Sequence, residues 1–212
     1  MEQLLQDSLK VKSLKLMEIG KYLHQKGWVP ATTGNFSIKL SEKFIAITVS
    51  GRHKGRLTED DIMIVDYEGN PVSDRKPSYE TLLHTAMYQL DPTVETVLHT
   101  HSVAATVLSG FMKGHIKICD YEILKVLRGI TTHKSEIMVP IFDNDQDMPA
   151  LSERIATYLY RHPTIHGYLL KEHGLYTWGT SAAEALTHLE ALEFLFEVKQ
   201  YQFLLETRRT ND

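Results

Sequence analysis

The sequence has one cysteine, Cys119, among 212 residues, so an intramolecular disulfide is excluded. A single thiol suits a reducing compartment, where disulfides are rare. Long apolar runs are also missing: nowhere do eighteen apolar residues follow one another, so no transmembrane helix is expected. The N-terminal stretch is polar and amphipathic and lacks the apolar centre of a signal peptide. These absences predict a cytoplasmic protein.

An excess of basic residues is missing as well. Lys and Arg number 23 against 27 Asp and Glu, and the formal net charge is −4 at pH 7. This balance argues against nucleic acid or an anionic membrane as a partner. A small anionic substrate is still compatible, because a local anion site needs only a few donors. The 42% hydrophobic and 24% charged residues are typical of a globular chain with a substantial core.

The pattern of apolar residues predicts one α/β domain over residues 1–212, because no repeat, low-complexity tract or linker interrupts it. Helices are predicted over 8–26, 76–90, 148–161 and 181–205, with shorter ones from 103 and over 122–130; strands over 35–40, 43–51, 61–72, 94–101 and 136–142, and two within 165–179 that meet near 172–174. Strands and helices do not alternate as regular βαβ units, and the hairpins imply antiparallel pairs. We therefore expect a mixed sheet covered by helices on both faces.

Two histidines stand one residue apart in the apolar stretch "VETVLHTHSVAATV", at His99 and His101. Alternate residues of a strand point to the same face, and two imidazoles on one face make half of a zinc site. Alone, the pair could equally be two polar residues at the mouth of a strand. A third candidate, His173, precedes a glycine in "LLKEHGLYTWG". Three histidines around zinc leave an open position for water or substrate.

Two short segments, "TTGNFS" and "TVSGRHKG", place small hydroxyl residues and a glycine at a strand end. Glycine lets backbone N–H groups approach an anion, while Lys54 could supply a point charge. Such segments can cradle a phosphate, and they can also be plain turns. Two carboxylates, Glu80 and Glu122, are candidates for a general base, provided that one of them faces the metal. Both are equally explained as ordinary surface or helix-start residues.

In chain order, "TTGNFS", "VSG", "KPSYETLLHTAMY", "VLHTHS" and "EHGLYTWG" resemble the class II aldolase/adducin family. The resemblance covers about residues 13 to 203. It implies an α/β/α sandwich with a mixed, largely antiparallel sheet, and a homotetramer with its sites at subunit interfaces. It also implies one Zn²⁺ held by His99, His101 and His173.

The resemblance further implies which residues bind a sugar-phosphate substrate. The family's phosphate-binding positions match Thr33, Gly34, Asn35, Ser50, Gly51 and Ser78, with Lys54 as an addition. The glutamate matching Glu80 can ligate the metal and exchange protons in the aldolases. The glutamate matching Glu122 is the better acid/base candidate in the family's dehydratases.

The segments "EILKVLRGI" and "FDNDQDMPAL" resemble these dehydratases, so dehydration of a sugar phosphate is the expected reaction. Two alternatives stay open at this point. An aldolase or epimerase acting on fuculose or ribulose phosphate would share the metal, the phosphate site and the fold. A non-catalytic binding module, as in the adducin head, would have lost the metal histidines, and all three are present here.

Overall fold

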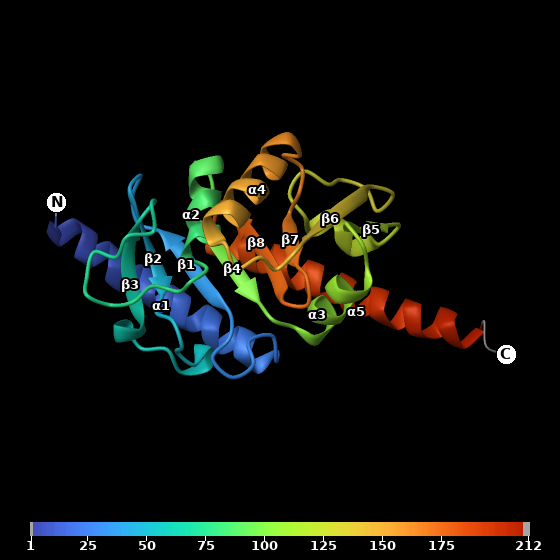
Figure 1. Ribbon diagram of the computed structural model, residues 1–212, viewed down its shortest axis with the longest axis horizontal. Helices are drawn as coiled ribbons and strands as arrows, with labels where there is room; N and C mark the ends of the chain where they lie inside the picture. Colours follow the sequence, from blue (N-terminus) through green and yellow to red (C-terminus); the bar gives the residue numbers. More distant parts are fainter. Residues whose placement is uncertain (1, 210–212) are drawn as a thin grey trace.

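Eight short strands form one mixed sheet at the centre of the computed structural model, which describes residues 2–209 (Figure 1). The strands are β1 (Asn35–Lys39), β2 (Phe44–Thr48), β3 (Ile62–Asp66), β4 (Thr96–Thr100), β5 (His115–Cys119), β6 (Glu136–Phe142), β7 (Gly167–Leu170) and β8 (Gly174–Gly179). They are ordered β3-β2-β1-β4-β8-β7-β6-β5 across the sheet. Every neighbouring pair is antiparallel except β6 and β7, which run parallel.

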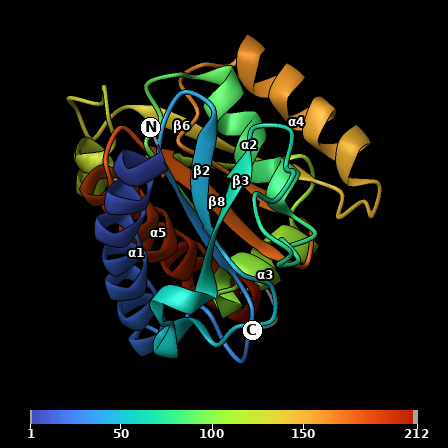
Figure 2. The ribbon, with the colours of Figure 1, turned by 90° about the vertical axis from the view of Figure 1, so that its left-hand side faces the viewer.

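Helices cover both faces of this sheet. One layer contains α1 (Glu2–Gln25), α3 (Val103–Phe111) and α5 (Ala182–Arg209); the other contains α2 (Thr81–Leu90) and α4 (Met148–Arg161). Figure 2 shows α1 and α5 on one side of the strands and α2 and α4 on the other. The predicted mixed sheet between two helical layers is therefore confirmed. Within residues 2–209, no helix has the length and apolar character needed to cross a membrane.

Strand β4 lies in the middle of the sheet and is buried along its whole length. Successive side chains of a strand point to opposite faces, so Val97 joins the core under α2 and α4 while Leu98 joins the core under α1 and α5. The alternation places His99 on the α2 side and Thr100 on the α5 side. Immediately after the strand, Ser102 caps α3 by accepting a hydrogen bond from the N–H of Ala105 at 3.0 Å.

Three local features of the structure differ from the sequence-based expectations. The helix expected over 122–130 is only a five-residue 3₁₀ helix, η3 (Glu122–Val126). Leu124 within this helix and Leu127 just after it are both buried and three residues apart, which suits the three-residue turn of a 3₁₀ helix. Strand β5 was not predicted, although its exposed and buried residues alternate. In addition, α2 begins at Thr81, because the preceding residues 77–80 form a loop rather than a first helical turn.

Gly174, the first residue of β8, lies where β8 comes very close to the backbone of β4. A Cβ atom added there would lie 1.9 Å from the backbone oxygen of Thr100, and backbone cannot rotate away. We expect Gly174→Ala to lower the free energy of unfolding by about 3 kcal/mol, measured by urea denaturation. Gly27→Ala is the control, because an added Cβ there meets nothing within 4 Å and only its φ of +76° is unfavourable. Equal losses in the two variants would contradict the close approach.

Candidate active site

The pairing of β4 with β8 brings three histidines together. His99 is in β4, His101 follows the end of that strand, and His173 lies in the turn between β7 and β8. One ring nitrogen from each can be chosen so that all three lie within 4.8 Å of one another. The structure thus brings together the three histidines that the sequence predicts as metal ligands, although His173 is more than seventy residues away from His99 and His101 in the sequence.

Two of these rings are oriented by hydrogen bonds from their Nδ1 atoms. His99 Nδ1–H donates to the backbone oxygen of Leu175 at 3.0 Å, and His173 Nδ1–H donates to Asn144 Oδ1 at 3.2 Å. Both rings therefore direct Nε2 toward the cluster, in the arrangement by which an outer partner fixes a metal-binding tautomer. The two Nε2 atoms are 3.3 Å apart. Two nitrogens bound at about 2.05 Å to one tetrahedral Zn²⁺ would be about 3.3 Å apart, so the donor set fits this ion.

Burial keeps two of the three rings, those of His99 and His101, in the neutral form that a metal requires. His99 is fully buried, and burial lowers its pKa well below the usual value. Burial, assisted by the neighbouring His173, lowers the pKa of His101 to about 4. Imidazole must be deprotonated to ligate a metal, so both rings are ready to bind at neutral pH.

Glu80 lies immediately before α2 and faces the histidine cluster. Its Oε1 is 3.1 Å from His173 Nε2, and its Oε2 is 3.7 Å from His99 Nε2. The amide of Asn35 donates to Oε2 at 2.6 Å. Burial opposes ionisation of this carboxyl, but His99, His173 and the Asn35 hydrogen bond outweigh burial and hold the pKa of Glu80 well below its usual range. Glu80 therefore presents a carboxylate to the histidines.

A cavity of about 260 Å³ opens beside His101 and Glu80. Its walls come from the segment before β1, the loop after β2 and the loop before α2. They include all seven residues that the family resemblance implies for phosphate binding: Thr33, Gly34, Asn35, Ser50, Gly51, Lys54 and Ser78. Segments distant in the sequence thus enclose one polar cavity next to the candidate metal ligands.

Lys54 is a buried part of this wall. Its side chain is almost inaccessible, and its Nζ donates to the backbone oxygens of Thr32 at 3.0 Å and Arg52 at 2.6 Å. Burial lowers the pKa of Lys54 to about 8. The ammonium group therefore joins the two loops that form the cavity and places a positive charge behind it.

Glu122 lies outside this arrangement. It is exposed in η3, where its carboxylate pairs with Lys125 and is 3.8 Å from His133 Nδ1. Three strands, β8, β7 and β6, separate β4 from β5, the strand that precedes η3. A single chain does not bring Glu122 to the histidine cluster.

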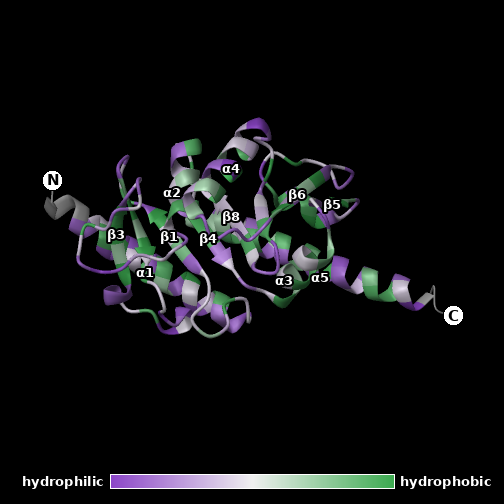
Figure 3. Cartoon of the chain, in the orientation of Figure 1, coloured by the Kyte–Doolittle hydropathy of each residue, from purple (hydrophilic) through white to green (hydrophobic). Residues whose placement is uncertain are grey.

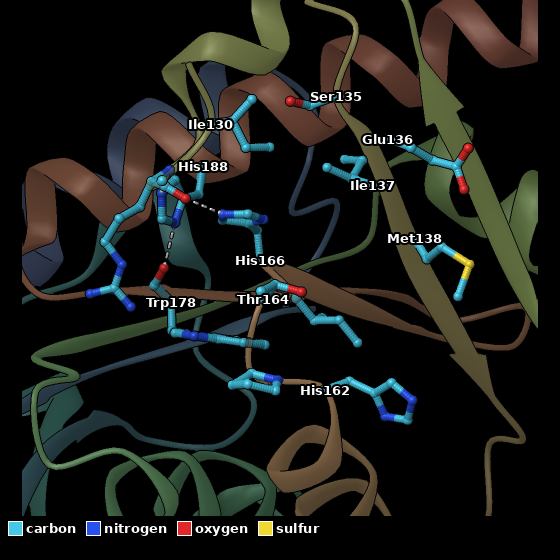
Figure 4. Close-up of a pocket in the computed structure, with 14 residues that line it drawn as sticks. Ile130, Ser135, Glu136, Ile137, Met138, His162, Thr164, His166, Trp178 and His188 are labelled. Atoms are coloured by element: carbon cyan, nitrogen blue, oxygen red, sulfur yellow. Dashed lines mark hydrogen bonds between the residues drawn. The ribbon is translucent and has the colours of Figure 1, made fainter. Parts of the chain in front are cut away.

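A second, larger cavity of about 530 Å³ lies at the opposite ends of β7 and β8 (Figure 4). Its histidines are occupied by backbone groups. His188 Nδ1–H donates to the Trp178 oxygen at 2.8 Å, and His188 Nε2 accepts from the Arg128 N–H at 3.2 Å. His166 Nε2–H donates to the Arg128 oxygen at 2.8 Å. These rings hold the ends of the strands in place, and none of them belongs to the three-histidine cluster.

Removing one imidazole should eliminate the metal. His101 is the best choice for substitution, because it is less buried than His99 and follows the strand rather than forming part of it. We expect purified His101→Ala to lose stoichiometric zinc, measured by elemental analysis after dialysis, while the exposed control His115→Ala keeps it. Full zinc content in His101→Ala would contradict the metal site.

The buried rings also predict how stability depends on pH. His84 and His101, with pKa values lowered to about 4 by burial, bind protons near pH 6.5 only after unfolding, as does buried His99. The free energy of unfolding of the metal-free protein should therefore fall as the pH drops from about 6.5 toward 4. Burial raises the pKa of Glu193 to about 7, so that group acts in the opposite direction between about pH 7 and 4.5.

We expect a net loss of about 3 kcal/mol between pH 7 and pH 5, measured by urea denaturation without metal. Glu193→Gln removes the opposing group, and its stability should fall more steeply over the same interval. Equal stability of the unmodified protein at the two pH values would show that these histidines are not held neutral.

Known proteins resemble this chain over most of its length. The family model described as "Class II Aldolase and Adducin N-terminal domain" matches residues 14–200. A methylthioribulose-1-phosphate dehydratase from Methylococcus capsulatus is 53% identical over 188 residues, which cover 89% of this chain and 92% of that protein. A protein of the same name from Marinobacter nauticus is 49% identical, with 92% of each chain covered.

The fold is also found among solved structures. The crystal structure of L-fuculose-1-phosphate aldolase from Thermus thermophilus is similar with a TM-score of 0.73 and 24% identity, covering 98% of this chain and 99% of the other. At that identity the likeness supports the architecture alone. The family model and the two relatives carry the assignment further: this chain belongs to the class II aldolase/adducin family.

Proposed function

We propose that this protein is a zinc-dependent hydro-lyase that converts 5-methylthioribulose 1-phosphate to 2,3-diketo-5-methylthiopentyl 1-phosphate and water in L-methionine salvage. The main observation behind the proposal is that the three histidines and the seven-residue polar cavity adjoin, with Glu80 and His101 lining that cavity. The names of the two relatives identify the substrate on which the proposal rests.

The substrate has a phosphate on C1, a carbonyl at C2 and hydroxyls at C3 and C4. Its phosphate suits the cavity, where the hydroxyls of Ser50 and Ser78 offer neutral donors and Lys54 contributes a positive charge. Anchoring the phosphate there holds C2 and C3 near the histidines. Binding energy gained at this remote group can position the reacting carbons.

The reaction removes one proton from C3 and the hydroxyl from C4. Zn²⁺ held by His99, His101 and His173 would supply a Lewis acid that polarises a carbonyl and so acidifies the adjacent C–H bond. A carboxylate of the protein accepts the C3 proton, and the C4 hydroxyl takes up a proton and leaves as water. The resulting C3–C4 enol then tautomerises to the diketone. Atoms balance, because the product differs from the substrate by one water.

We assign the acid/base role to Glu122, acting in the site of a neighbouring subunit of a homotetramer. This assignment accounts for its exposed position away from the histidines of its own chain. Apolar side chains exposed on neighbouring helices support self-association. They are Val103, Val107 and Phe111 of α3 and Tyr201, Phe203, Leu204 and Leu205 of α5. The C-terminal part of α5 projects beyond the sheet and carries several hydrophobic residues (Figure 3).

The proposed reaction is tested by incubating zinc-loaded protein with 5-methylthioribulose 1-phosphate and following the product by mass spectrometry. We expect the loss of one water with the carbon skeleton intact. Release of a small aldehyde from this or another sugar 1-phosphate would mean aldol cleavage and would overturn the dehydratase proposal. No reaction with the substrate would overturn it equally.

The role of Glu122 is tested with Glu122→Gln, which keeps the size of the side chain and removes its ability to accept a proton. We expect this variant to retain zinc and to lose turnover by about a hundredfold or more. Glu136→Gln is the matched control, because Glu136 is also exposed and paired with a lysine, Lys117. Near-normal turnover in Glu122→Gln would transfer the role to Glu80.

Mixing two inactive variants tests whether Glu122 serves another subunit. Oligomers assembled from unfolded and refolded Glu122→Gln and His101→Ala chains should regain turnover, because some sites would combine an intact histidine cluster with an intact Glu122. Mixed assembly is verified by native mass spectrometry. Mixed oligomers that stay inactive would place the action of Glu122 within its own chain.

A further inference from the structure

Behind Glu80, four buried side chains form one continuous chain of hydrogen bonds. The Tyr88 hydroxyl is 2.8 Å from Ser37 Oγ, and Ser37 Oγ is 2.8 Å from His84 Nδ1. His84 Nε2 hydrogen-bonds to Asn35 Oδ1. Asn35 Nδ2 then donates to Glu80 Oε2 at 2.6 Å. The chain thus runs from the core under α2 to the edge of the candidate active site.

Two secondary-structure periods produce this alignment. Glu80, His84 and Tyr88 are spaced by four residues, which places them along one face of the segment leading into and through α2. Asn35 and Ser37 are spaced by two in β1, so both point to the same face of the sheet. Glu80, His84 and Tyr88 therefore each lie within hydrogen-bonding distance of Asn35 or Ser37 on the strand.

The donors and acceptors along the chain have only one consistent order. Glu80 offers carboxylate oxygens, so Asn35 must present its NH₂ group to Glu80 and its Oδ1 to His84. His84 Nε2 must then carry the proton, which leaves Nδ1 as an acceptor for the Ser37 hydroxyl. Ser37 Oγ in turn accepts from the Tyr88 hydroxyl. Reversing any single group would bring two acceptors or two donors together.

The side chains of this hydrogen-bonded series are buried, so no water can replace a lost partner. His84 is fully buried and Asn35 and Tyr88 nearly so. Burial also lowers the pKa of His84 to about 4, so the ring is neutral and has one donor and one acceptor. A group that lost its partner here would not find water in its place, and such a loss is costly inside a protein.

We propose that His84 is a positioning residue: its Nε2–H fixes the amide of Asn35, and through that amide the carboxylate of Glu80 and the Ser78 side of the cavity. Asn35 Nδ2 also lies 3.3 Å from Ser78 Oγ, so one amide reaches both the carboxylate and the cavity. What the positioned groups do in catalysis rests on the proposed function. The direction of the hydrogen bonds does not.

Two substitutions of His84 distinguish the hydrogen bond made by Nε2 from the one made by Nδ1. In His84→Gln the amide nitrogen can take the place of Nε2 and still donate to Asn35. In His84→Asn the shorter amide can meet Ser37, but it cannot reach Asn35. We expect His84→Asn to lower kcat by about tenfold or more, and to weaken inorganic phosphate binding measured by calorimetry, whereas His84→Gln keeps both within about threefold. Equal behaviour of the two variants would overturn the proposal.

His188→Asn is the matched control for the loss of a buried histidine. His188 is buried and both of its ring nitrogens are bonded, but its partners lie at the far ends of the strands. Its substitution should lower thermal stability without changing kcat or phosphate affinity. A fall of kcat in His188→Asn as large as that in His84→Asn would mean a general structural effect and would overturn the positioning role.

The ring tautomer can be read directly from nitrogen NMR of protein with ¹⁵N-labelled histidines, without substrate. The resonance that disappears in His84→Gln should show a proton on Nε2 and none on Nδ1. A proton on Nδ1 would overturn the proposal, whatever the enzyme's substrate proves to be. If the tautomer is as expected but 5-methylthioribulose 1-phosphate does not react, the proposed function alone has failed, and phosphate binding still compares the two variants.

Discussion

The antiparallel pairing of β4 with β8 is the interaction on which the candidate site depends. It brings the end of β4, with His99 and His101, beside the turn that carries His173. Gly174 lies against the backbone of Thr100, and no side chain fits between them. On the face of the sheet opposite His99, the Thr100 hydroxyl donates to Glu193 Oε1 at 2.8 Å. This hydrogen bond attaches the end of β4 to α5. These two contacts thus fix the end of the strand from which His99 and His101 project.

Polar groups in the low-dielectric interior impose the second constraint. Buried imidazoles stay neutral, while the carboxylate of Glu80 is stabilised by the groups that surround it. Each buried group needs a partner of the correct polarity, which is why Asn35 and His84 can have only one orientation. Lys54 obeys the same rule by donating to two loop carbonyls. The residues around the site therefore support one another, and few of them could change alone.

Much of this site could be predicted from the sequence, because its parts are local. The spacing of His99 and His101 follows from strand geometry, and the small polar residues near Gly34 and Gly51 mark loops at strand ends. The resemblance to a known family then grouped these segments with His173. The fold class follows in the same way, because alternating and helical patterns identify most of the strands and helices.

Other features could not be predicted, since they depend on contacts between segments. The spacing of Glu80 and His84 was visible, but only the packing of α2 on β1 inserts Asn35 between them. Asn144 reaches His173 through a loop whose course no periodicity describes. Glu122 differs from these residues: its motif resembles that of the family's dehydratases, yet its carboxylate pairs with Lys125, away from the histidines of its own chain.

The three-histidine metal site and the adjoining phosphate cavity are tested together by anomalous X-ray diffraction from crystals of the zinc-loaded protein grown with inorganic phosphate. We expect one zinc peak per chain, within bonding distance of His99, His101 and His173, with phosphate in the cavity bordered by Asn35, Ser50 and Ser78. A zinc peak elsewhere in the chain, with the three imidazoles unligated, would contradict this expectation.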